Sequence, residues 1–426
     1  MNLRRTSLPL ALIVSLGWVG VSSAADWAQF HGPQRDSIST ETGLLQEWPE
    51  GGPTLLWKME GLGKGYSSVS IADDKIFTMG DLEEGDDESQ FVIAFDLNTR
   101  QRLWATRVGG PHGDGSRCTP TVDDGLVYAI GTSGDLVCVK ADTGELVWRK
   151  NFGDDFGGKM MSGWKYSESP LIDGDKLVCT PGADDAIIVA LDKKTGSTVW
   201  KAPMQEIGDE GKDGAAYSSI IVAEIDGVRQ YIQIVGRGAI SVDAATGKFL
   251  WGYNRVANRT ANITKPLAHG NHVFVTSSYK TGSALLKVTL DGGKFNVEEV
   301  YWLTPDDFEN HHGAVVLLGD KLYGGDGQNN GTPVCLDFLT GKIHWKPEAP
   351  SRGSAAIVYA DGHFVFRYDS GQVVLIEATP EKFNLKGSFD QTDRSGRRAW
   401  PHPVILDGKL YLRDGNLLLC YDVAAK

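Results

Sequence analysis

An eleven-residue pattern recurs along this chain of 426 residues. It reads a small residue, Asp two positions later, Thr-Gly after two more residues and Trp at the end, and it is complete at 190–200, 241–251 and 335–345. Two further copies, at 94–104 and 138–148, each depart at one position, with Arg100 in place of the Gly and Lys140 in place of the Asp. Five copies of one pattern indicate a structural unit that is repeated along the chain.

Each copy has the composition of a tight hairpin. Apolar residues flank the turn, Asp and Thr side chains can hydrogen-bond its backbone, and Gly accepts a positive φ. The segment before each copy, such as 169–181, has apolar runs around turn residues and provides two more strands. The unit is therefore predicted to be a four-stranded antiparallel sheet with the Trp on its outermost strand.

The spacing of the Trp residues predicts the number of units. Seven Trp residues recur at similar intervals and Phe389 follows one period later; the Trp positions are 57, 104, 148, 200, 251, 302 and 345. We therefore predict an all-β protein, an eight-bladed β-propeller of four-stranded antiparallel blades, over residues 50–426. The N-terminal strand around Trp57 should pair with the C-terminal strand 416–423 to complete the last blade, which leaves no open sheet in the ring.

The first residues predict export. Arg4 and Arg5 precede an apolar run from Leu8 to Val21, and small residues follow at 22–25. This order is typical of a cleavable signal peptide, here residues 1–25, and the run is shorter than the roughly 20 residues that span a bilayer. We expect a protein without transmembrane segments in a periplasm or outside the cell, and an N-terminal extension, residues 26–49, that lies along the outside of the propeller.

Charge and cysteine usage narrow the function classes. The formal net charge is −13 and no cluster of Lys and Arg stands out, which argues against nucleic acid as a partner. Of the five Cys residues, Cys138, Cys335 and Cys420 stand at the small position of the repeat and are interpreted as core residues. Because the number is odd, at least one Cys has no partner within the chain. We expect a monomer.

The repeat resembles the PQQ-type β-propeller repeat, which is shared by quinoprotein alcohol dehydrogenases and BamB-like outer-membrane assembly factors. The resemblance covers nearly all of the chain after residue 25, and the opening Asp26–Arg35 is similar to the start of many secreted propellers of this type. In that family the repeat Trp residues pack between blades. The resemblance thus implies structural roles for six residues, Trp104, Trp148, Trp200, Trp251, Trp302 and Trp345.

The dehydrogenase branch of this family implies a cofactor and a metal. Its members bind pyrroloquinoline quinone (PQQ) beside a calcium ion held by a Glu, an Asn and an Asp. Carried over to this chain, those ligands would be Glu168, Asn262 and either Asp306 or Asp307. The adjacent Cys pair usual in that branch is absent here, and the chain is short for it.

The residues at the start of each unit's first strand form a second set of candidates. Propellers place that strand innermost, so these residues should meet around one mouth of the central channel. They are Tyr66, Arg117, Tyr166, Glu168, Tyr217, Asn262, His311, His312, Arg352, Trp400 and His402. Aromatic, cationic and acidic groups around one mouth suit a small polar or anionic ligand, or a peptide. The alternative is that they line a water-filled pore.

Two function classes follow from these residues and this resemblance. The first is a non-catalytic binding or scaffolding propeller, BamB-like in architecture, which holds an exported protein or a small polar ligand at the channel mouth and needs no cofactor. The second is a dehydrogenase that uses PQQ and calcium to oxidise alcohols or sugars. A third class is a polysaccharide-binding protein.

Overall fold

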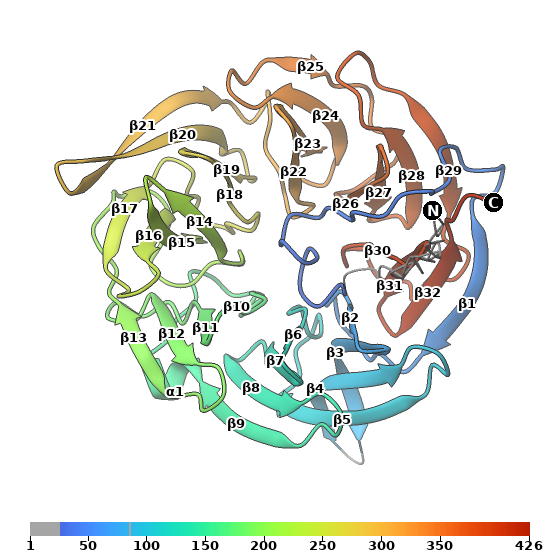
Figure 1. Ribbon diagram of the computed structural model, residues 1–426, viewed down its shortest axis with the longest axis horizontal. Helices are drawn as coiled ribbons and strands as arrows, with labels where there is room; N and C mark the ends of the chain where they lie inside the picture. Colours follow the sequence, from blue (N-terminus) through green and yellow to red (C-terminus); the bar gives the residue numbers. More distant parts are fainter. Residues whose placement is uncertain (1–25, 85–86) are drawn as a thin grey trace, which may run out of the picture.

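The computed structural model describes residues 26–84 and 87–426 and confirms the predicted fold. Eight four-stranded antiparallel sheets stand around a central axis as the blades of a propeller (Figure 1). Within those residues there is one helix, α1 (Phe152–Phe156), and no helix is long and apolar enough to cross a membrane. The predicted signal peptide, residues 1–25, lies outside the described residues.

The first four blades follow one another along the chain, each with its innermost strand first. Blade 1 contains β2 (Ser70–Ala72), β3 (Lys75–Glu84), β4 (Asp87–Asp96) and β5 (Arg102–Gly109). Blade 2 contains β6 (Thr121–Asp123), β7 (Leu126–Ile130), β8 (Asp135–Lys140) and β9 (Leu146–Asn151). Blade 3 contains β10 (Leu171–Asp173), β11 (Lys176–Cys179), β12 (Ile188–Asp192) and β13 (Thr198–Ala202). Blade 4 contains β14 (Ile221–Ile225), β15 (Val228–Val235), β16 (Gly238–Asp243) and β17 (Phe249–Tyr253).

The remaining blades complete the ring. Blade 5 contains β18 (Leu267–His269), β19 (His272–Ser277), β20 (Gly282–Asp291) and β21 (Lys294–Leu303). Blade 6 contains β22 (Val315–Leu318), β23 (Lys321–Asp326), β24 (Thr332–Asp337) and β25 (Ile343–Trp345). Blade 7 contains β26 (Ala355–Ala360), β27 (His363–Tyr368), β28 (Gln372–Glu377) and β29 (Leu385–Asp390). Blade 8 contains β30 (Val404–Leu406), β31 (Lys409–Asp414), β32 (Leu417–Asp422) and β1 (Thr54–Glu60).

The ring closes as predicted from the sequence. The N-terminal strand β1 pairs antiparallel with the C-terminal strand β32, with Trp57 opposite Cys420 and Glu60 opposite Leu417. The two ends of the propeller domain therefore share one blade, which gives β32 a partner on each side.

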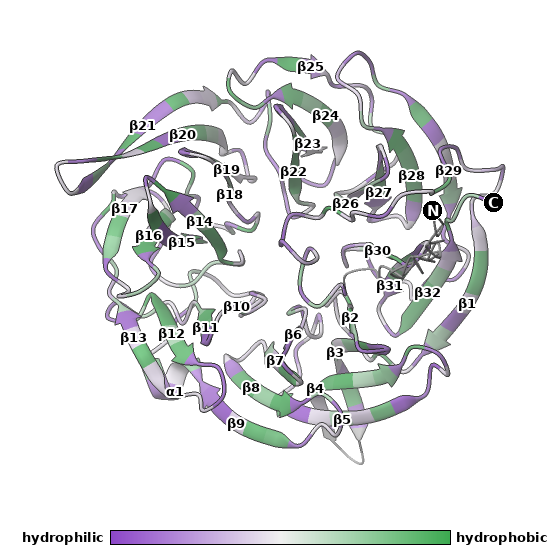
Figure 2. Ribbon diagram, viewed as in Figure 1, coloured by the Kyte–Doolittle hydropathy of each residue, from purple (hydrophilic) through white to green (hydrophobic). Residues whose placement is uncertain are grey.

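The strands differ in burial according to their place in the blade. Middle strands such as β8 and β12 are apolar almost throughout and buried on both faces, because each blade packs between two others. Outer strands such as β13 alternate, so that Trp200 is buried while Val199 and Lys201 are exposed. Figure 2 shows this division, with the middle strands mostly hydrophobic and the outer strands, such as β9 and β13, mixed in hydropathy. All five Cys residues are buried and free.

The repeated turn is held by the residues that the pattern contains. In blade 4, Asp243 Oδ1 accepts hydrogen bonds from Thr246 N and Thr246 Oγ1, at 2.8 and 2.7 Å, and Gly247 has a φ of 73°. A Cβ on Gly247 would lie 2.4 Å from the indole of Trp200, which belongs to blade 3. Gly144 meets Trp104 and Gly196 meets Trp148 in the same way. The Trp of one blade therefore packs on the turn of the next, which explains why both residues recur.

Several repeat Trp residues also hydrogen-bond to the neighbouring blade. Trp104 Nε1 donates to Ala141 O and Trp148 Nε1 to Lys193 O, both at 2.9 Å, and Trp345 Nε1 donates to Thr379 O at 2.8 Å. Trp251 instead donates to Gln230 of its own blade at 2.9 Å.

Blade 5 departs from the pattern at Trp302. There Tyr301 takes the place of the Trp, because its ring lies against Gly341 of blade 6 and its hydroxyl donates to Phe338 O at 2.9 Å. Trp302 is covered by the guanidinium of Arg255, 4.1 Å from the ring centre.

We predict that Gly247→Ala destabilises the protein more than Gly227→Ala in the same blade. Both residues have a positive φ, of 73° and 76°, so either Ala is strained by about 1 kcal/mol. A Cβ on Gly227 meets nothing within 4 Å, whereas one on Gly247 collides with Trp200, which adds about 1–3 kcal/mol. Urea unfolding of the two variants measures the difference, and equal losses would show that the indole moves aside at no cost.

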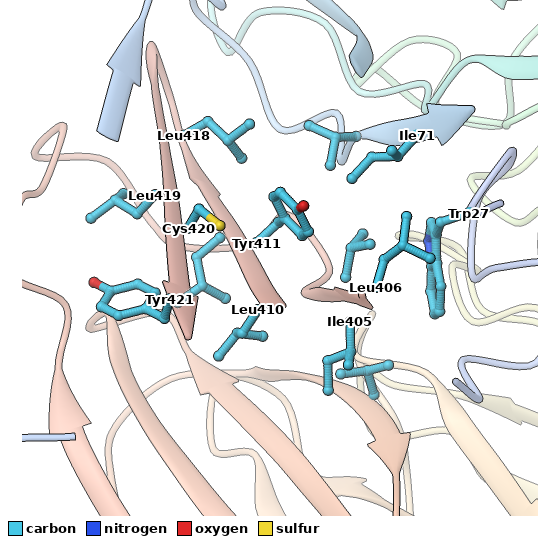
Figure 3. Close-up of a cluster of buried hydrophobic side chains, with 14 of the residues drawn as sticks. Trp27, Ile71, Ile405, Leu406, Leu410, Tyr411, Leu418, Leu419, Cys420 and Tyr421 are labelled. Carbon is cyan, nitrogen blue, oxygen red and sulfur yellow. The ribbon is translucent and has the colours of Figure 1, made fainter. Parts of the chain in front are cut away.

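The N-terminal extension corrects one prediction. Residues 40–49 lie along the outside, where Leu45 N bonds Val423 O and Trp48 N bonds Lys386 O, both at 2.8 Å. Residues 26–39, here called the plug segment, instead cross the middle of the ring (Figure 1). Trp27 forms an antiparallel bridge with Ile71 and is buried near Leu406, between blades 8 and 1 (Figure 3). Trp27 is only 4% exposed there, and burial of so large an apolar side chain favours this course.

Candidate functional site

A cavity of about 510 Å³ lies on the axis of the ring. Its walls come from seven of the eight blades and from the plug segment. The plug segment also explains why blade 7 is missing from the wall. Ile38 forms a parallel bridge with Tyr359 of β26, and Ser39 N donates to Tyr359 O at 2.8 Å, so the segment stands beside the innermost strand of that blade.

The walls are positioned by hydrogen bonds that run from blade to blade. Ser68 N donates to Thr119 Oγ1 at 3.1 Å, Thr119 N to Ser169 Oγ at 2.9 Å, and Ser169 N to Ser219 Oγ at 3.0 Å. These hydroxyl residues recur about 50 residues apart, two positions before the innermost strand of blades 1 to 4. The sequence contains this signal, and it fixes the register of neighbouring blades around the channel.

The structure brings together seven of the eleven residues predicted at the channel mouth. The seven that line the cavity are Tyr66, Arg117, Tyr217, His311, His312, Trp400 and His402. Ligand binding by these residues stays a prediction. The other four residues, Tyr166, Glu168, Asn262 and Arg352, are not part of the cavity wall.

Side-chain alternation along an extended segment explains why three of these four residues do not line the cavity. Ser167 faces the cavity, so its neighbours Tyr166 and Glu168 point into the protein. Tyr166 donates to Pro181 O at 2.8 Å, and Glu168 accepts from Thr180 N and Thr180 Oγ1 at 2.8 and 2.9 Å. In blade 5, Ala261 and Ile263 face the cavity while Asn262, between them, is fully buried.

Arg352 is missing from the cavity wall for another reason. It is exposed in the loop before β26, and in this blade the plug segment stands beside the innermost strand.

The plug segment forms one end of the cavity, which we call the floor and define by Phe30, His31, Lys265 and His402. The rings of Phe30 and His31 are stacked with centres 3.7 Å apart, and His31 lies 4.3 Å from the ring of His402. Neither ring nitrogen of His31 has a hydrogen-bond partner within residues 26–84 and 87–426. Burial lowers the pKa of His31 far below its usual range, and nearby His402 and Lys265 lower it further.

The plug segment is held in place by Arg35. Its guanidinium donates to Ser169 O at 2.9 Å and to Pro170 O at 3.1 Å, at the start of blade 3. The backbone of His31, Arg35 and Ser37 has φ values of 64°, 56° and 62°. This left-handed turn carries Phe30 and His31 into the channel.

Histidine and aromatic rings continue along one wall. His402 Nε2 bonds His312 O at 3.0 Å, and the centre of the His312 ring is 4.9 Å from that of Trp400. His311 contacts Tyr279 Oη through Nε2 at 3.0 Å and Ser354 Oγ through Nδ1 at 2.7 Å. Burial lowers the pKa of His311 and of His402 to about 4, so both rings are neutral at pH 7.

Lys265 is the buried cation of the floor. It is 6% exposed and lines the cavity, and among the described residues its ammonium group has no hydrogen-bond or ion-pair partner. Burial lowers the pKa of Lys265 to about 8, although Asp36 of the plug segment acts in the opposite direction. A buried cation without a counter-ion costs free energy, and an anion from outside would relieve this cost.

The opposite end of the cavity, which we call the rim, contains Asp114, Arg117, Trp164 and Arg398. Arg117 pairs with Asp114 at 2.7 Å, and Trp164 is 44% exposed. Arg398 lies over the ring of Trp400, 5.3 Å from its centre.

The charge of the wall is opposite to that of the chain. Three side chains that are cationic at pH 7 line the cavity, Arg117, Lys265 and Arg398, against one carboxylate, Asp114. The chain as a whole has a formal net charge of −13. Cationic walls in a narrow cavity focus the field on an anion.

The predicted calcium set does not fit a cation in this cavity. Both oxygens of Glu168 accept internal hydrogen bonds, and burial raises the pKa of Glu168 to about 8. Asn262 donates to Val235 O at 3.1 Å and accepts from Asn258 N at 3.0 Å. Asp306 and Asp307 are exposed beyond β21, the outer strand of blade 5.

The described part of the chain contains no cluster of three or more His, Cys, Asp or Glu residues that could hold an ion. Quinone binding stays a prediction.

Comparison with known proteins places the chain in a family. The sequence profile of the family described as outer membrane protein assembly factor BamB matches residues 88–347, more than half of the chain. The chain belongs to this family. It is 26% identical to the BamB of Shewanella oneidensis over 74% of this chain and 87% of that protein. It is 25% identical to the BamB of Burkholderia pseudomallei over 60% of this chain, and the match spans 61% of that protein.

The fold is also shared with an enzyme. The quinohemoprotein alcohol dehydrogenase of Comamonas testosteroni superposes with a TM-score of 0.62 and 13% identity, over 96% of this chain and 82% of the enzyme. Identity this low concerns the fold alone. Proteins of this architecture thus include both function classes predicted from the sequence. Because the fold does not distinguish the two classes, the residues of the cavity have to be compared with what each class needs.

Proposed function

We propose that this protein is an exported, non-catalytic binding propeller that holds a small anionic ligand in its axial cavity. The observation that carries this proposal is the cavity wall, in which three cations and one carboxylate stand among aromatic rings in an otherwise acidic chain. Its volume of about 510 Å³ lies within the range of small-molecule sites.

The aromatic rings define the ligand further. Tyr66, Trp164, Tyr217, Tyr279 and Trp400 line the cavity. Such rings pack well against a planar, largely apolar body. The cations at the rim would attract the ligand, and those rings would hold its planar part.

Binding of an exported protein at the rim is the other form of the same function. Relatives named as assembly factors of the outer membrane favour it. Such a partner would contact the exposed rim residues, Trp164 and Arg398 among them, and would leave the floor free. Ligand entry to the floor therefore distinguishes the two forms.

We expect small aromatic acids to bind at one saturable site in the purified protein without its signal peptide. Titration calorimetry and the fluorescence of Trp164 and Trp400, which line the cavity, report binding. The panel contains mandelate, phenylacetate, mandelamide, simple sugars, and PQQ with and without calcium. Calcium-dependent binding of PQQ together with dye reduction in the presence of alcohols would instead support the dehydrogenase class.

A cavity-filling variant locates the site. Ser167 is half-buried in the wall, and Ser167→Trp fills part of the cavity. Ser197→Trp adds the same side chain to an exposed outer turn of blade 3 and is the matched control. We expect Ser167→Trp to abolish binding of the acids and Ser197→Trp to keep it. Unchanged binding in Ser167→Trp, or no binding of any panel member to the parent protein, would contradict the proposal.

A further inference from the structure

Lys265 occupies a position that has a structural role in the preceding blades. There, two residues before the innermost strand, the hydroxyls of Thr119, Ser169 and Ser219 each accept a hydrogen bond from a backbone N–H of the blade before. An ammonium group only donates, so Lys265 cannot form this bond. Blade 5 therefore replaces a residue that joins two blades by one that cannot join them in this way.

The amine of Lys265 is open to a ligand. Lys265 lines the cavity and is only 6% exposed, and in the described chain its nitrogen has no hydrogen-bond or ion-pair partner. The unpartnered ring nitrogens of His31 are sealed off by their neighbours, whereas the nitrogen of Lys265 keeps accessible surface. Buried polar groups nearly always have partners in proteins, so an unpaired amine on a cavity wall indicates a ligand.

The surroundings of Lys265 favour its neutral form. Burial lowers the pKa of Lys265 to about 8; Asp36 of the plug segment acts against this change and Arg35 acts with it. The rings of His31 and His402 are neutral at pH 7, because burial lowers their pKa and the charge of Lys265 lowers it further. About one amine in ten is therefore neutral at pH 7, against fewer than about one in a thousand for a solvated lysine. Only the neutral amine is a nucleophile.

A neutral amine on a cavity wall can bind an aldehyde covalently. Nζ adds to the carbonyl carbon, and the addition product loses water to give an imine. The C=N bond replaces the C=O bond, two hydrogens of the amine leave with the carbonyl oxygen as water, and the third ammonium proton passes to solvent. Nothing is oxidised or reduced. The neutral imine also removes the buried charge of Lys265, which costs free energy.

We propose that Lys265 is a covalent binding residue that captures a small aromatic aldehyde as an imine. The inference rests on the proposed function in that a small ligand enters this cavity. The ring of the aldehyde then lies in a cavity whose walls include Tyr66, Tyr217 and Trp400. Because water hydrolyses an imine back to the amine and the aldehyde, the ligand is held and released without a net reaction.

Reductive trapping tests this inference in the purified protein without its signal peptide. The probe para-formylbenzoate has a planar ring, a carboxylate and an aldehyde. Sodium cyanoborohydride reduces its imine to a stable amine, which peptide mass spectrometry locates. At pH 7 we expect Lys265 to be modified about tenfold or more faster than the exposed Lys382, because more of its amine is neutral. Equal rates at the two lysines, or no adduct at Lys265, would overturn the inference.

Lys265→Arg separates the amine from the charge, because a guanidinium stays cationic and forms no imine under these conditions. Without reductant, we expect the parent protein to bind para-formylbenzoate about tenfold or more tightly than para-(hydroxymethyl)benzoate, in which an alcohol replaces the aldehyde. Lys265→Arg should bind the two equally, and so should Lys265→Ser, which has the residue of blades 3 and 4 at this position and covers a failure of the Arg variant to fold. Lys382→Met is the matched control and should keep the difference. A difference that persists without Lys265 would contradict the imine.

The cavity-filling pair tests where the reaction occurs. Ser167→Trp should slow the modification of Lys265 about tenfold or more, and Ser197→Trp should leave it unchanged. Equal rates in both variants would show that the aldehyde reaches Lys265 by another route, against the inference. If phenylacetate binds but no adduct forms at Lys265, the inference fails and the proposed function stands. If the acids do not bind and no adduct forms, both fail.

Discussion

Replacing Arg413 by Met is expected to lower the free energy of unfolding by about 3–5 kcal/mol. Arg413 stands on β31 of blade 8 and is 1% exposed. Its guanidinium donates to Ser67 O, Leu62 O and Gly63 O at 3.1, 3.2 and 3.2 Å, all at the start of blade 1, and to Met79 O at 2.6 Å. Met fills a similar volume but leaves these buried acceptors without donors.

The size of the effect follows from the place of Arg413 in the ring. It joins the last blade to the first, beside the pairing of β1 with β32 that closes the propeller. No carboxylate lies within ion-pair distance in the described chain, and burial lowers the pKa of Arg413 to about 9. The free energy gained here therefore comes from hydrogen bonds to carbonyl groups and not from a counter-ion.

Urea unfolding at pH 8, compared between variants, measures this contribution. Arg413→Lys keeps a cation but loses the planar fork, so an intermediate loss is expected. Arg259→Met removes an exposed arginine and should change the free energy of unfolding by no more than about 0.5 kcal/mol. A loss below about 1 kcal/mol in Arg413→Met would show that water replaces the guanidinium in this position.

The blades could be predicted from the sequence because their signals are local. The turn needs Asp, Thr and Gly within a few residues, and the Gly of each turn is fixed by contact with a Trp one period earlier, as Gly247 is by Trp200. The closing strand followed from counting Trp57 as an eighth outer strand. Both inferences depend on spacing along the chain, which a sequence displays directly.

The plug segment could not be predicted in this way. The plug segment forms only isolated β-bridges, such as Trp27 with Ile71 and Ile38 with Tyr359. Isolated bridges leave no periodic pattern in the sequence. Its position depends on long-range contacts, such as that of Arg35 with Ser169 O. The position of Phe30 and His31 in the floor therefore could not be predicted from the sequence.

Lys265 was missed although the sequence contains a signal for it. The recurring hydroxyl residue stands two positions before the innermost strand in blades 1 to 4, at Ser68, Thr119, Ser169 and Ser219, and Lys265 stands at that position in blade 5. A lone cation at that position in blade 5 has no structural reason in the repeat. Tyr166 and Glu168 were wrongly placed at the mouth because one residue decides which way a side chain of an extended segment points.

Acidification from pH 7 to pH 5 is expected to destabilise the parent protein more than a His311→Asn/His402→Gln variant, by about 4 kcal/mol. The pKa of both His residues is about 4 in the folded protein and near 6.5 in the unfolded chain. Below pH 6.5 the unfolded chain therefore binds protons that the folded protein does not, and stability falls until the pH reaches the folded values. At pH 5 this amounts to about 2 kcal/mol for each His.

Other buried groups also change stability between pH 7 and pH 5, some lowering it and some raising it. The double variant is needed to isolate the contribution of His311 and His402. The pKa values of His31 and His312 are also lowered by burial, and these residues add to the loss. The carboxyl groups of Glu168 and Asp369, with pKa values of about 8 and 6, oppose it because the folded protein keeps their protons longer. Arg398 faces His311, and Lys265 and Arg367 face His402, and all three cations favour the neutral rings.

For each variant, the free energy of unfolding at pH 5 is subtracted from that at pH 7. This difference does not contain the stability that the substitutions themselves remove at both pH values. Urea unfolding at pH 7 and pH 5 gives this difference for the parent protein, the double variant and His344→Gln, in which an exposed His is replaced. The His344→Gln protein should lose as much stability as the parent. If the double variant does so too, both rings are already protonated at pH 5 in the folded protein, and burial does not lower their pKa to about 4.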